Sequence, residues 1–322
     1  MRVRTAYNFD DVHLVPAYSE LKGRMDVSLE TRISWATLSL PLISAAMDTI
    51  TSYKMANFMR SNGALGVLHR YMTIDEQVEE AKQAVGPRPD LYGAELTAVS
   101  VGVNGDAMQR ALACVEVGVG IVMLDVAHGD TLAALRFVEE LRAKHSDIII
   151  CSANIVTVEA ARRYREAGAD VLRVGLGSGS VCDTTNLTAV GYPQLSAVSE
   201  MHNTYPNVPI LSDGGVRGPA DVVKVLAAGA SAVISGRLFA GYPWTPMPGV
   251  YRGMASPEAL KGYKKDTKHA AEGHSVSVKE LNHPQAYANF KELVNHIKIG
   301  LSYVGARNIQ ELQEKARWVE AK

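Results

Sequence analysis

The chain has 322 residues, of which 47% are hydrophobic and 21% charged, and its formal net charge is -1. This length suits a single α/β barrel domain with a large core. A charge so close to zero argues against a protein that binds polymeric nucleic acid, because it leaves no basic excess to neutralise phosphates.

Membrane and export signals are not found in the sequence. No run of about 18 uninterrupted apolar residues predicts a membrane span, and the first residues lack the apolar core of a signal peptide. The three cysteines, Cys114, Cys151 and Cys182, are too few for a disulfide framework. We therefore expect a cytoplasmic protein with reduced thiols and no membrane partner.

Short apolar runs alternate with segments of helical periodicity along the chain. The predicted strands are Pro41–Met47, Leu65–His69, Thr97–Val103, Ile121–Val126, Ile148–Ala153, Val171–Val174, Pro209–Ser212 and Ala232–Ser235. The predicted helices are Tyr53–Ser61, Asp75–Ala84, Asp106–Val117, Leu132–Lys144, Val158–Ala167, Gln194–His202, Pro219–Ala227 and Tyr287–Leu301. This alternation predicts one (β/α)8 TIM barrel over residues 1–322, with an open doubly wound sheet as the alternative.

A glycine-rich turn, Gly175–Cys182, follows the sixth predicted strand and ends in a thiol. Glycines allow positive φ and close approach of the backbone to a ligand. This position suits a nucleophile whose electrophile is held by phosphate contacts nearby. The alternative is a loop cysteine without a role.

Two further glycine motifs, Asp213–Gly215 and Gly236-Arg237, follow the seventh and eighth predicted strands. These loops form the usual phosphate cradle of such a barrel, so a phosphorylated ligand is favoured over simple tight turns. Asp213 is expected to accept hydrogen bonds from ribose hydroxyls or to cap the next helix.

Polar residues at other strand ends are open to two interpretations. Asp125 and Asn154 either orient a second ligand or cap a helix. Arg173 lies inside a predicted strand, where a guanidinium needs a paired carboxylate. Residues 241–285 include a stretch rich in proline and aromatic residues and a lysine-rich one, and we expect a flap or lid there.

With these residues collected, the chain resembles the family of IMP dehydrogenases and GMP reductases. The motifs that carry the resemblance are Tyr7–Val12, Ser44–Thr49, Gly175–Cys182, Thr184, Ser212–Gly215, Tyr251–Met254 and Glu272-Gly273. The resemblance implies catalytic roles for Cys182, Thr184 and Glu272. It implies substrate contacts for Ser44, Met47, Ser180, Asp213, Gly214, Gly215, Gly236, Tyr251, Gly253 and Met254. Arg237, beside Gly236, is also expected to contact the substrate, because its guanidinium can form a bidentate pair with phosphate. It implies cofactor contacts for Arg70, Asp125, His128, Gly129, Asn154 and Arg173.

The family's chemistry implies attack of the Cys182 thiolate on C2 of a purine nucleotide, with hydride transfer between C2 and a nicotinamide. Of the two directions, the sequence favours an NADPH-dependent GMP reductase. No regulatory domain is inserted at 86–93, residues 255–271 hold no arginine to activate water, and 189–195 and 239–241 resemble reductases. The alternatives are an NAD-dependent IMP dehydrogenase, with Lys268 or His269 as an unusual base, and a nucleotide-binding homologue without turnover. Arg70 and the residues around it, 66–74, read more like a dehydrogenase.

Other implications of the resemblance concern ions and assembly. Carbonyls of Gly177, Gly179 and Cys182 are implied to bind a monovalent cation such as K+, and the family forms homotetramers. The departures from the family pattern are Asp183 beside the thiol, Thr185-Asn186, and Arg237 in place of a small residue. Together they leave room for a substrate other than plain GMP.

Overall fold

The computed structural model describes residues 3–86, 96–263 and 271–321, and within them eight parallel strands form a closed barrel. In barrel order these strands are β4 (Leu42–Ser44), β5 (Leu65–Leu68), β6 (Ala98–Val101), β7 (Ile121–Leu124), β8 (Ile149–Ile155), β9 (Val171–Val174), β10 (Ile210–Asp213) and β11 (Ala232–Ser235). The barrel closes where β11 pairs with β4. The predicted TIM barrel is confirmed, and the open sheet is wrong.

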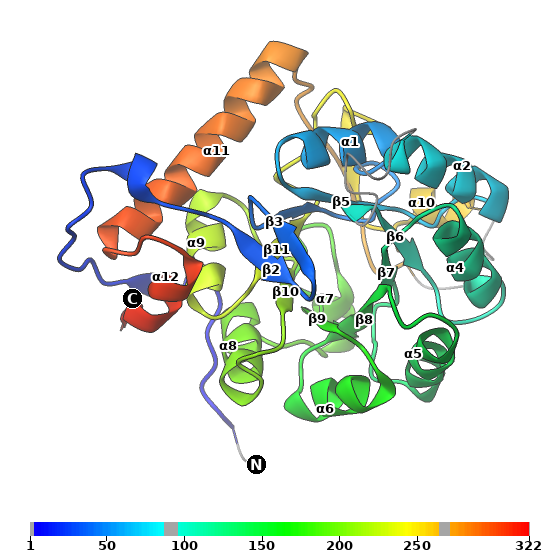
Figure 1. Cartoon of the computed structure of the whole chain (residues 1–322), viewed down its shortest axis with the longest axis horizontal. Helices are drawn as coiled ribbons and strands as arrows, with labels where there is room; N and C mark the ends of the chain where they lie inside the picture. Colours follow the sequence, from blue (N-terminus) through cyan, green and yellow to red (C-terminus); the bar gives the residue numbers. More distant parts are fainter. Residues whose placement is uncertain (1–2, 87–95, 264–270, 322) are drawn as a thin grey trace.

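Helices of the described chain cover the outside of the barrel (Figure 1). They are α1 (Tyr53–Ser61), α2 (Ile74–Val85), α4 (Ala107–Glu116), α5 (Leu132–Lys144), α6 (Val158–Ala167), α8 (Gln194–Thr204), α9 (Pro219–Ala227) and α11 (His283–Tyr303). Threonines cap several of these N-termini, and Thr73 forms a reciprocal capping box with Glu76. Such caps satisfy the free N–H groups of the first turn, which is why the helices begin where the sequence predicts.

The core has two layers, one between barrel and helices and one inside the barrel. Ile33 and Leu38 of the hairpin formed by β2 (Thr31–Ile33) and β3 (Ala36–Leu38) belong to the inner layer. This hairpin covers the end of the barrel that faces the viewer in Figure 1. One end of the barrel is therefore closed by apolar packing, and ligands must approach from the other.

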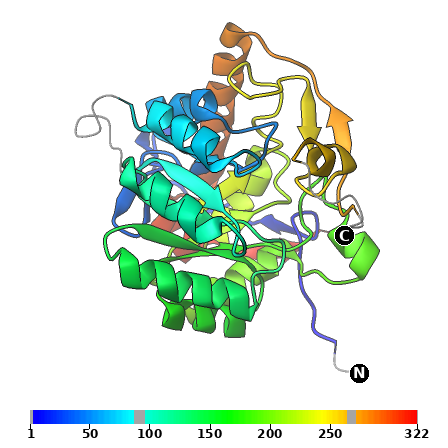
Figure 2. The same ribbon diagram turned by 90° about the vertical axis from the view of Figure 1, so that its right-hand side faces the viewer.

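The segment 241–285 divides into an anchored part and a part above the open end. Trp244 stacks on Phe58 of α1 with ring centroids 4.0 Å apart, and Tyr242 is buried, so the aromatic stretch is fixed in the core. Beyond it, β12 (Val250–Arg252) pairs with β13 (Ser275–Ser277), and α10 (Pro257–Gly262) lies between them in sequence. Figure 2 shows this hairpin and α10 on one side of the barrel.

Small elements complete the described chain. They are η1 (Arg24–Asp26), α7 (Thr184–Thr188), α12 (Ile309–Lys315), β1 (Val12–Leu14) and β14 (Trp318–Glu320). β1 and β14 pair antiparallel, which places residues 12–14 beside residues 318–320. In the described ranges, no helix is long and apolar enough to cross a membrane.

Candidate active site

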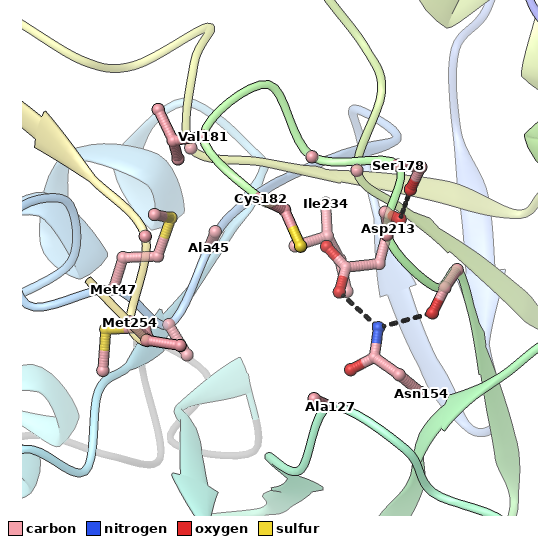
Figure 3. Close-up of a pocket in the computed structure, with 18 of the residues that line it drawn as sticks. Ala45, Met47, Ala127, Asn154, Ser178, Val181, Cys182, Asp213, Ile234 and Met254 are labelled. Carbon is pink, nitrogen blue, oxygen red and sulfur yellow. Dashed lines mark hydrogen bonds between the residues drawn. The ribbon is translucent and has the colours of Figure 1, made fainter. Parts of the chain in front are cut away.

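A cavity of about 280 Å³ lies at the carboxyl ends of the barrel strands, where the sequence places its polar motifs. The Gly175–Cys182 turn lines much of it, together with residues that follow β4, β5, β7, β10 and β11 and residues from β12 onward. In Figure 3 the sulfur of Cys182 points into this space beside Asp213 and Ile234. Catalytic sites of TIM barrels occupy this end.

Cys182, Thr184 and Glu272 form a continuous chain of polar contacts. Sγ of Cys182 lies 3.2 Å from Oγ1 of Thr184, and that hydroxyl donates to Oε2 of Glu272 over 2.9 Å. Thr184 begins α7, whereas Glu272 is 88 residues further along the chain. A thiol, a hydroxyl and a carboxylate in this order can pass a proton between the cavity and the carboxylate.

Two backbone hydrogen bonds hold Glu272 in that position. The N–H of Asp183 donates to the carbonyl of Glu272 over 2.8 Å, and the N–H of His274 donates to the carbonyl of Val181 over 3.2 Å. Cys182 and Gly273 thus form an antiparallel bridge. A Cβ on Gly273 would lie 2.9 Å from the Val181 carbonyl, so a side chain there would separate the two segments.

Burial separates Cys182 from the two other cysteines. Cys114 and Cys151 are buried, and burial raises the pKa of their thiols to about 11 and about 12, respectively. Cys182 is partly exposed in the cavity. Because the thiolate is the nucleophile, Cys182 is the thiol suited to covalent chemistry.

The carboxylate of Asp183, next to the nucleophile, contacts an imidazole. Nδ1 of His274 lies 2.9 Å from Oδ2 of Asp183. A carboxylate beside a thiol disfavours the thiolate unless it is compensated. His274 was not among the predicted site residues, and its position just after the Glu272-Gly273 motif is the signal that would have found it.

The glycines that follow β10 and β11 carry no side chain, so neighbouring loops pack closely against their backbone and the ligand can approach it from the cavity. Gly214 and Gly215 have φ of 91° and 79°. A Cβ on Gly214 would lie 2.5 Å from Oγ of Ser178, and one on Gly236 would lie 2.6 Å from Sδ of Met47. Ser178 also donates to the Asp213 carbonyl over 3.0 Å. The three loops therefore form one compact wall, as a phosphate cradle requires.

Asp213 is the carboxylate that pairs with Arg173. Nη2 of Arg173 lies 2.8 Å from Oδ2 of Asp213, and the Arg173 side chain is 8% exposed. Nδ2 of Asn154 donates to the same oxygen over 2.9 Å and also reaches the Gly175 carbonyl, as Figure 3 shows. These contacts fix one carboxylate oxygen of Asp213.

Asp125 joins this network through two arginines. Nε of Arg70 donates to it over 3.0 Å, and Nη1 of Arg173 lies 3.5 Å away. Both arginines and Asp125 line the cavity. The predicted cofactor residues Arg70, Asp125, Asn154 and Arg173 are thus brought together as one polar wall.

Three predicted site residues do not line this cavity. Ser44 is fully buried, and its hydroxyl accepts a hydrogen bond from Thr51. Gly129 packs against Ala153, where a Cβ would lie 2.7 Å away, and His128 is exposed beyond the cavity wall. In the structure Ser44 and Gly129 pack against neighbouring residues of the protein and do not face the cavity. The other predicted substrate residues, namely Met47, Ser180, Asp213, Gly214, Gly215, Gly236, Arg237, Tyr251, Gly253 and Met254, all line it.

The segment around Met254 is held over the cavity by contacts between separate motifs of the sequence. Arg252 forms an ion pair with Asp48, and the Asp48 N–H approaches Sδ of Met254 at 3.3 Å. The hydroxyl of Tyr71 donates to the Met254 carbonyl over 2.8 Å. These contacts come from residues far apart in sequence, and no local pattern marks them.

The monovalent cation site and the two alternative bases remain predictions. The Gly179 carbonyl accepts the Cys182 N–H over 3.0 Å, which leaves one lone pair for a monovalent cation. No cluster of three or more His, Cys, Asp or Glu side chains suits a metal ion in the part of the chain that the structure describes. Lys268 and His269, the alternative bases, lie outside the described residues.

Comparison with known families agrees with this geometry. Residues 6–322 match the family described as IMP dehydrogenase / GMP reductase domain. The chain belongs to this family. The resemblance inferred from the motifs is therefore confirmed, and the chain is an oxidoreductase of the IMP dehydrogenase / GMP reductase family with a purine nucleotide substrate and a nicotinamide cofactor.

The similar proteins found are named inosine-5'-monophosphate dehydrogenases. That of Cryptosporidium parvum is 32% identical, with 97% of this chain and 91% of the relative covered. Those of Aquifex aeolicus and Halalkalibacterium halodurans are each 28% identical, with 99% and 97% of this chain and 93% and 92% of the relatives covered. These names favour the dehydrogenase alternative over the expected reductase.

The lengths of these alignments also bear on domain organisation. They run to 371, 460 and 448 positions, although the chain has 322 residues. The relatives therefore carry residues without a counterpart here.

Proposed function

We propose that this family member oxidises IMP to XMP through a covalent intermediate on Cys182, with NAD as the hydride acceptor. The observation that carries the proposal is the Cys182–Thr184–Glu272 chain, with contacts of 3.2 and 2.9 Å at the cavity. It supplies both the nucleophile and a base, and the lack of arginine in residues 255–271 therefore does not leave hydrolysis without a base.

The nucleotide is oriented by the loops after the last two strands. Backbone N–H groups at Gly214, Gly215 and Gly236 hold the phosphate, and the free carboxylate oxygen of Asp213 accepts from the ribose hydroxyls. The purine then lies between Met47 and Cys182, which both line the cavity. This arrangement presents C2 of the base to Sγ.

In the first half of the reaction the Cys182 thiolate adds to C2, and a C–S bond forms as the hydride leaves that carbon. The nicotinamide cofactor supplies the hydride acceptor. Its binding is ascribed to the wall of Arg70, Asp125 and Arg173, which borders the same cavity as Cys182. The arginines and aspartates of this wall form ion pairs with one another. The wall therefore presents fixed dipoles to a bound ligand.

In the second half water attacks the same carbon and the C–S bond breaks. Thr184 takes the proton from water while it passes its own proton to Glu272, and Cys182 leaves as the thiolate. The product is the 2-oxo purine nucleotide. The carboxylate is 2.9 Å from the threonine hydroxyl, which is within reach for this transfer.

The second candidate is reductive deamination of GMP to IMP and ammonia with NADPH. Two observations favour it: residues 255–271 contain no arginine, and 189–195 resemble the reductases. Here Glu272 and Thr184 would deliver a proton to the departing amine instead of removing one from water. The names of the relatives favour the dehydrogenase.

One assay separates these candidates. Purified protein is incubated with IMP and NAD, and in parallel with GMP and NADPH, while the nicotinamide absorbance is followed and the nucleotides are identified by mass spectrometry. The proposal predicts NADH and XMP from the first mixture. Formation of IMP from GMP, with no XMP, would establish the second candidate. Nucleotide binding without turnover in either mixture would establish a silent homologue.

A further inference from the structure

The segment Tyr7–Asp10, which we call the strap, belongs to a motif that the chemistry at C2 does not use. It precedes β1 and runs past α8 and α9, where Figure 1 shows the N-terminal trace. The N–H of Tyr7 donates to Oγ of Ser196 on α8 over 2.8 Å. Nζ of Lys224 on α9 donates to the Phe9 carbonyl over 2.7 Å. The strap is therefore fixed to both helices.

Gln194, the first residue of α8, connects the strap to two strands of the barrel. Its backbone N–H donates to Oδ1 of Asn8 over 2.8 Å. Its side chain is fully buried, and Nε2 donates to the Val174 carbonyl over 2.7 Å and to Oγ of Ser212 over 2.9 Å. Val174 ends β9, and Ser212 lies one residue before the end of β10. The strap is thus connected to the two strands from which the nucleophile and the glycines after β10 project.

Phe9 packs directly against the loop after β10. Its ring is 4% exposed and belongs to the core layer between barrel and helices, whereas Gly215 lines the cavity. A Cβ on Gly215 would lie 2.8 Å from Cε2 of Phe9 and 3.4 Å from the Ser178 carbonyl. Gly215, which has φ of 79°, is therefore held between the Phe9 ring and the Gly175–Cys182 turn.

Asp10 holds the same loop two residues beyond Gly215. Nη1 and Nη2 of Arg217 donate to the two carboxylate oxygens of Asp10 over 2.8 and 2.5 Å. The backbone N–H of Arg217 donates to Oδ2 of Asp221 over 2.9 Å. A bidentate pair fixes geometry even where exposure keeps its energy small. The strap therefore contacts the loop after β10 at Gly215 and again at Arg217.

We propose that Phe9 is a positioning residue for the phosphate of the nucleotide substrate. Its ring keeps the N–H of Gly215 where it donates to the phosphate, and the other contacts of the strap keep the ring in place. A glycine at positive φ has much conformational freedom, and a cavity in place of the ring would let the loop move away. Donors of a binding site must keep their positions closely, so the phosphate would lose contacts. This inference rests on the proposed function, from which it takes the phosphate site.

The test compares IMP with inosine, which has the same base and ribose but no phosphate. The measured quantity is the ratio of the Kd of inosine to the Kd of IMP, obtained by calorimetry on Cys182→Ala protein so that no turnover occurs. Phe9→Leu and Phe9→Ala are introduced into this protein. The matched controls are Phe137→Leu and Phe137→Ala, which change a ring on α5 that is 5% exposed. Circular dichroism verifies that each variant is folded.

Before these substitutions the ratio should be on the order of 100, because several N–H groups donate to a charged phosphate. Phe9→Ala should lower it about tenfold by weakening IMP binding alone, and Phe9→Leu should lower it about threefold. The Phe137 variants should keep it.

Two results overturn the inference and leave the proposed function standing: a ratio that the Phe9 variants do not change, or an equal loss of affinity for both ligands. The second result would mean that the ring only stabilises the fold. If Phe9→Ala does not fold, Phe9→Leu decides between these outcomes. A ratio near one before any Phe9 substitution would instead refute the phosphate site of the proposed function, and the inference with it.

Discussion

His274 and Asp183 form a pair across the active-site bridge, with Nδ1 and Oδ2 2.9 Å apart and side chains 47% and 32% exposed. Because Asp183 adjoins the nucleophile, His274 is the partner that holds this carboxylate next to Cys182. The departure from the family pattern at residue 183 is thus matched by a partner on the facing segment.

The pair predicts how fast Cys182 reacts with an alkylating agent. In His274→Gln the imidazole contact to Asp183 is lost, and a carboxylate beside a thiol disfavours the thiolate. Iodoacetamide should therefore modify Cys182 about three- to tenfold more slowly at pH 7. Adding Asp183→Asn to that variant should restore the rate. Peptide mass spectrometry measures modification at each cysteine, with buried Cys114 as the internal control. Equal rates in the native protein and in His274→Gln would contradict the compensation.

Glu272→Gln should separate the two half-reactions. The base acts only when water attacks, so the first turnover should still yield NADH as a rapid burst, while steady-state turnover falls about 100-fold or more. Thr184→Ala should behave in the same way. The control is Glu258→Gln on α10, whose carboxylate accepts from Ser275 and not from Thr184. Stopped-flow absorbance measures burst and steady state together, and loss of the burst in Glu272→Gln would be incompatible with this role.

His69 should make the folded protein less stable in mild acid. Burial lowers its pKa to about 4, against 6.5 for the exposed side chain, and its Nδ1 accepts the Tyr71 N–H over 3.2 Å. The unfolded chain therefore binds a proton that the folded chain does not. The contribution of His69 is fully present above pH 6.5 and falls as the pH drops toward 4.

The size of this effect follows from linkage. Between pH 7.5 and pH 5, His69 should lower the free energy of unfolding by about 2 kcal/mol. His69→Asn keeps an acceptor near the Tyr71 N–H and removes the titration, so urea denaturation at both pH values should show a change smaller by that amount. An identical pH dependence in native protein and variant would mean that His69 is not kept neutral by burial.

Gly214→Ala tests whether the glycine loops bind the phosphate. The residue has φ of 91°, and a Cβ would approach Oγ of Ser178 at 2.5 Å, so the loop must shift away from its position. We expect IMP to bind at least tenfold more weakly in calorimetry, about 1.4 kcal/mol. Gly23→Ala is the matched control, since no atom lies within 4 Å of its Cβ. Unchanged affinity in Gly214→Ala would exclude these loops as the phosphate site.

Much of the fold follows from local sequence, and the site follows in part. Eight apolar runs, most of them ended by glycine or polar residues, are enough to indicate the barrel, and strand ends such as Asp213 then share one face. The 88 residues between Thr184 and Glu272 are beyond any local pattern. Family resemblance supplied that pair, and the structure brought it together.

Proximity in sequence does not bring every residue of a motif to the cavity. Ser44 and Gly129 belong to motifs at strand ends, but neighbouring residues in a loop do not all face the ligand. Ser44 lies inward against Thr51, and Gly129 lies against β8. His274 was missed because its role depends on a partner 91 residues away. Only the folded chain shows such pairings.

The most direct test of this account is the turnover of Cys182→Ala. Without Sγ no covalent bond to C2 can form, so NADH production from an inosine nucleotide and NAD should fall by at least about a thousandfold, while calorimetry should show nucleotide affinity within a few fold of native. An alanine variant that makes NADH at the native rate would contradict covalent catalysis by this residue.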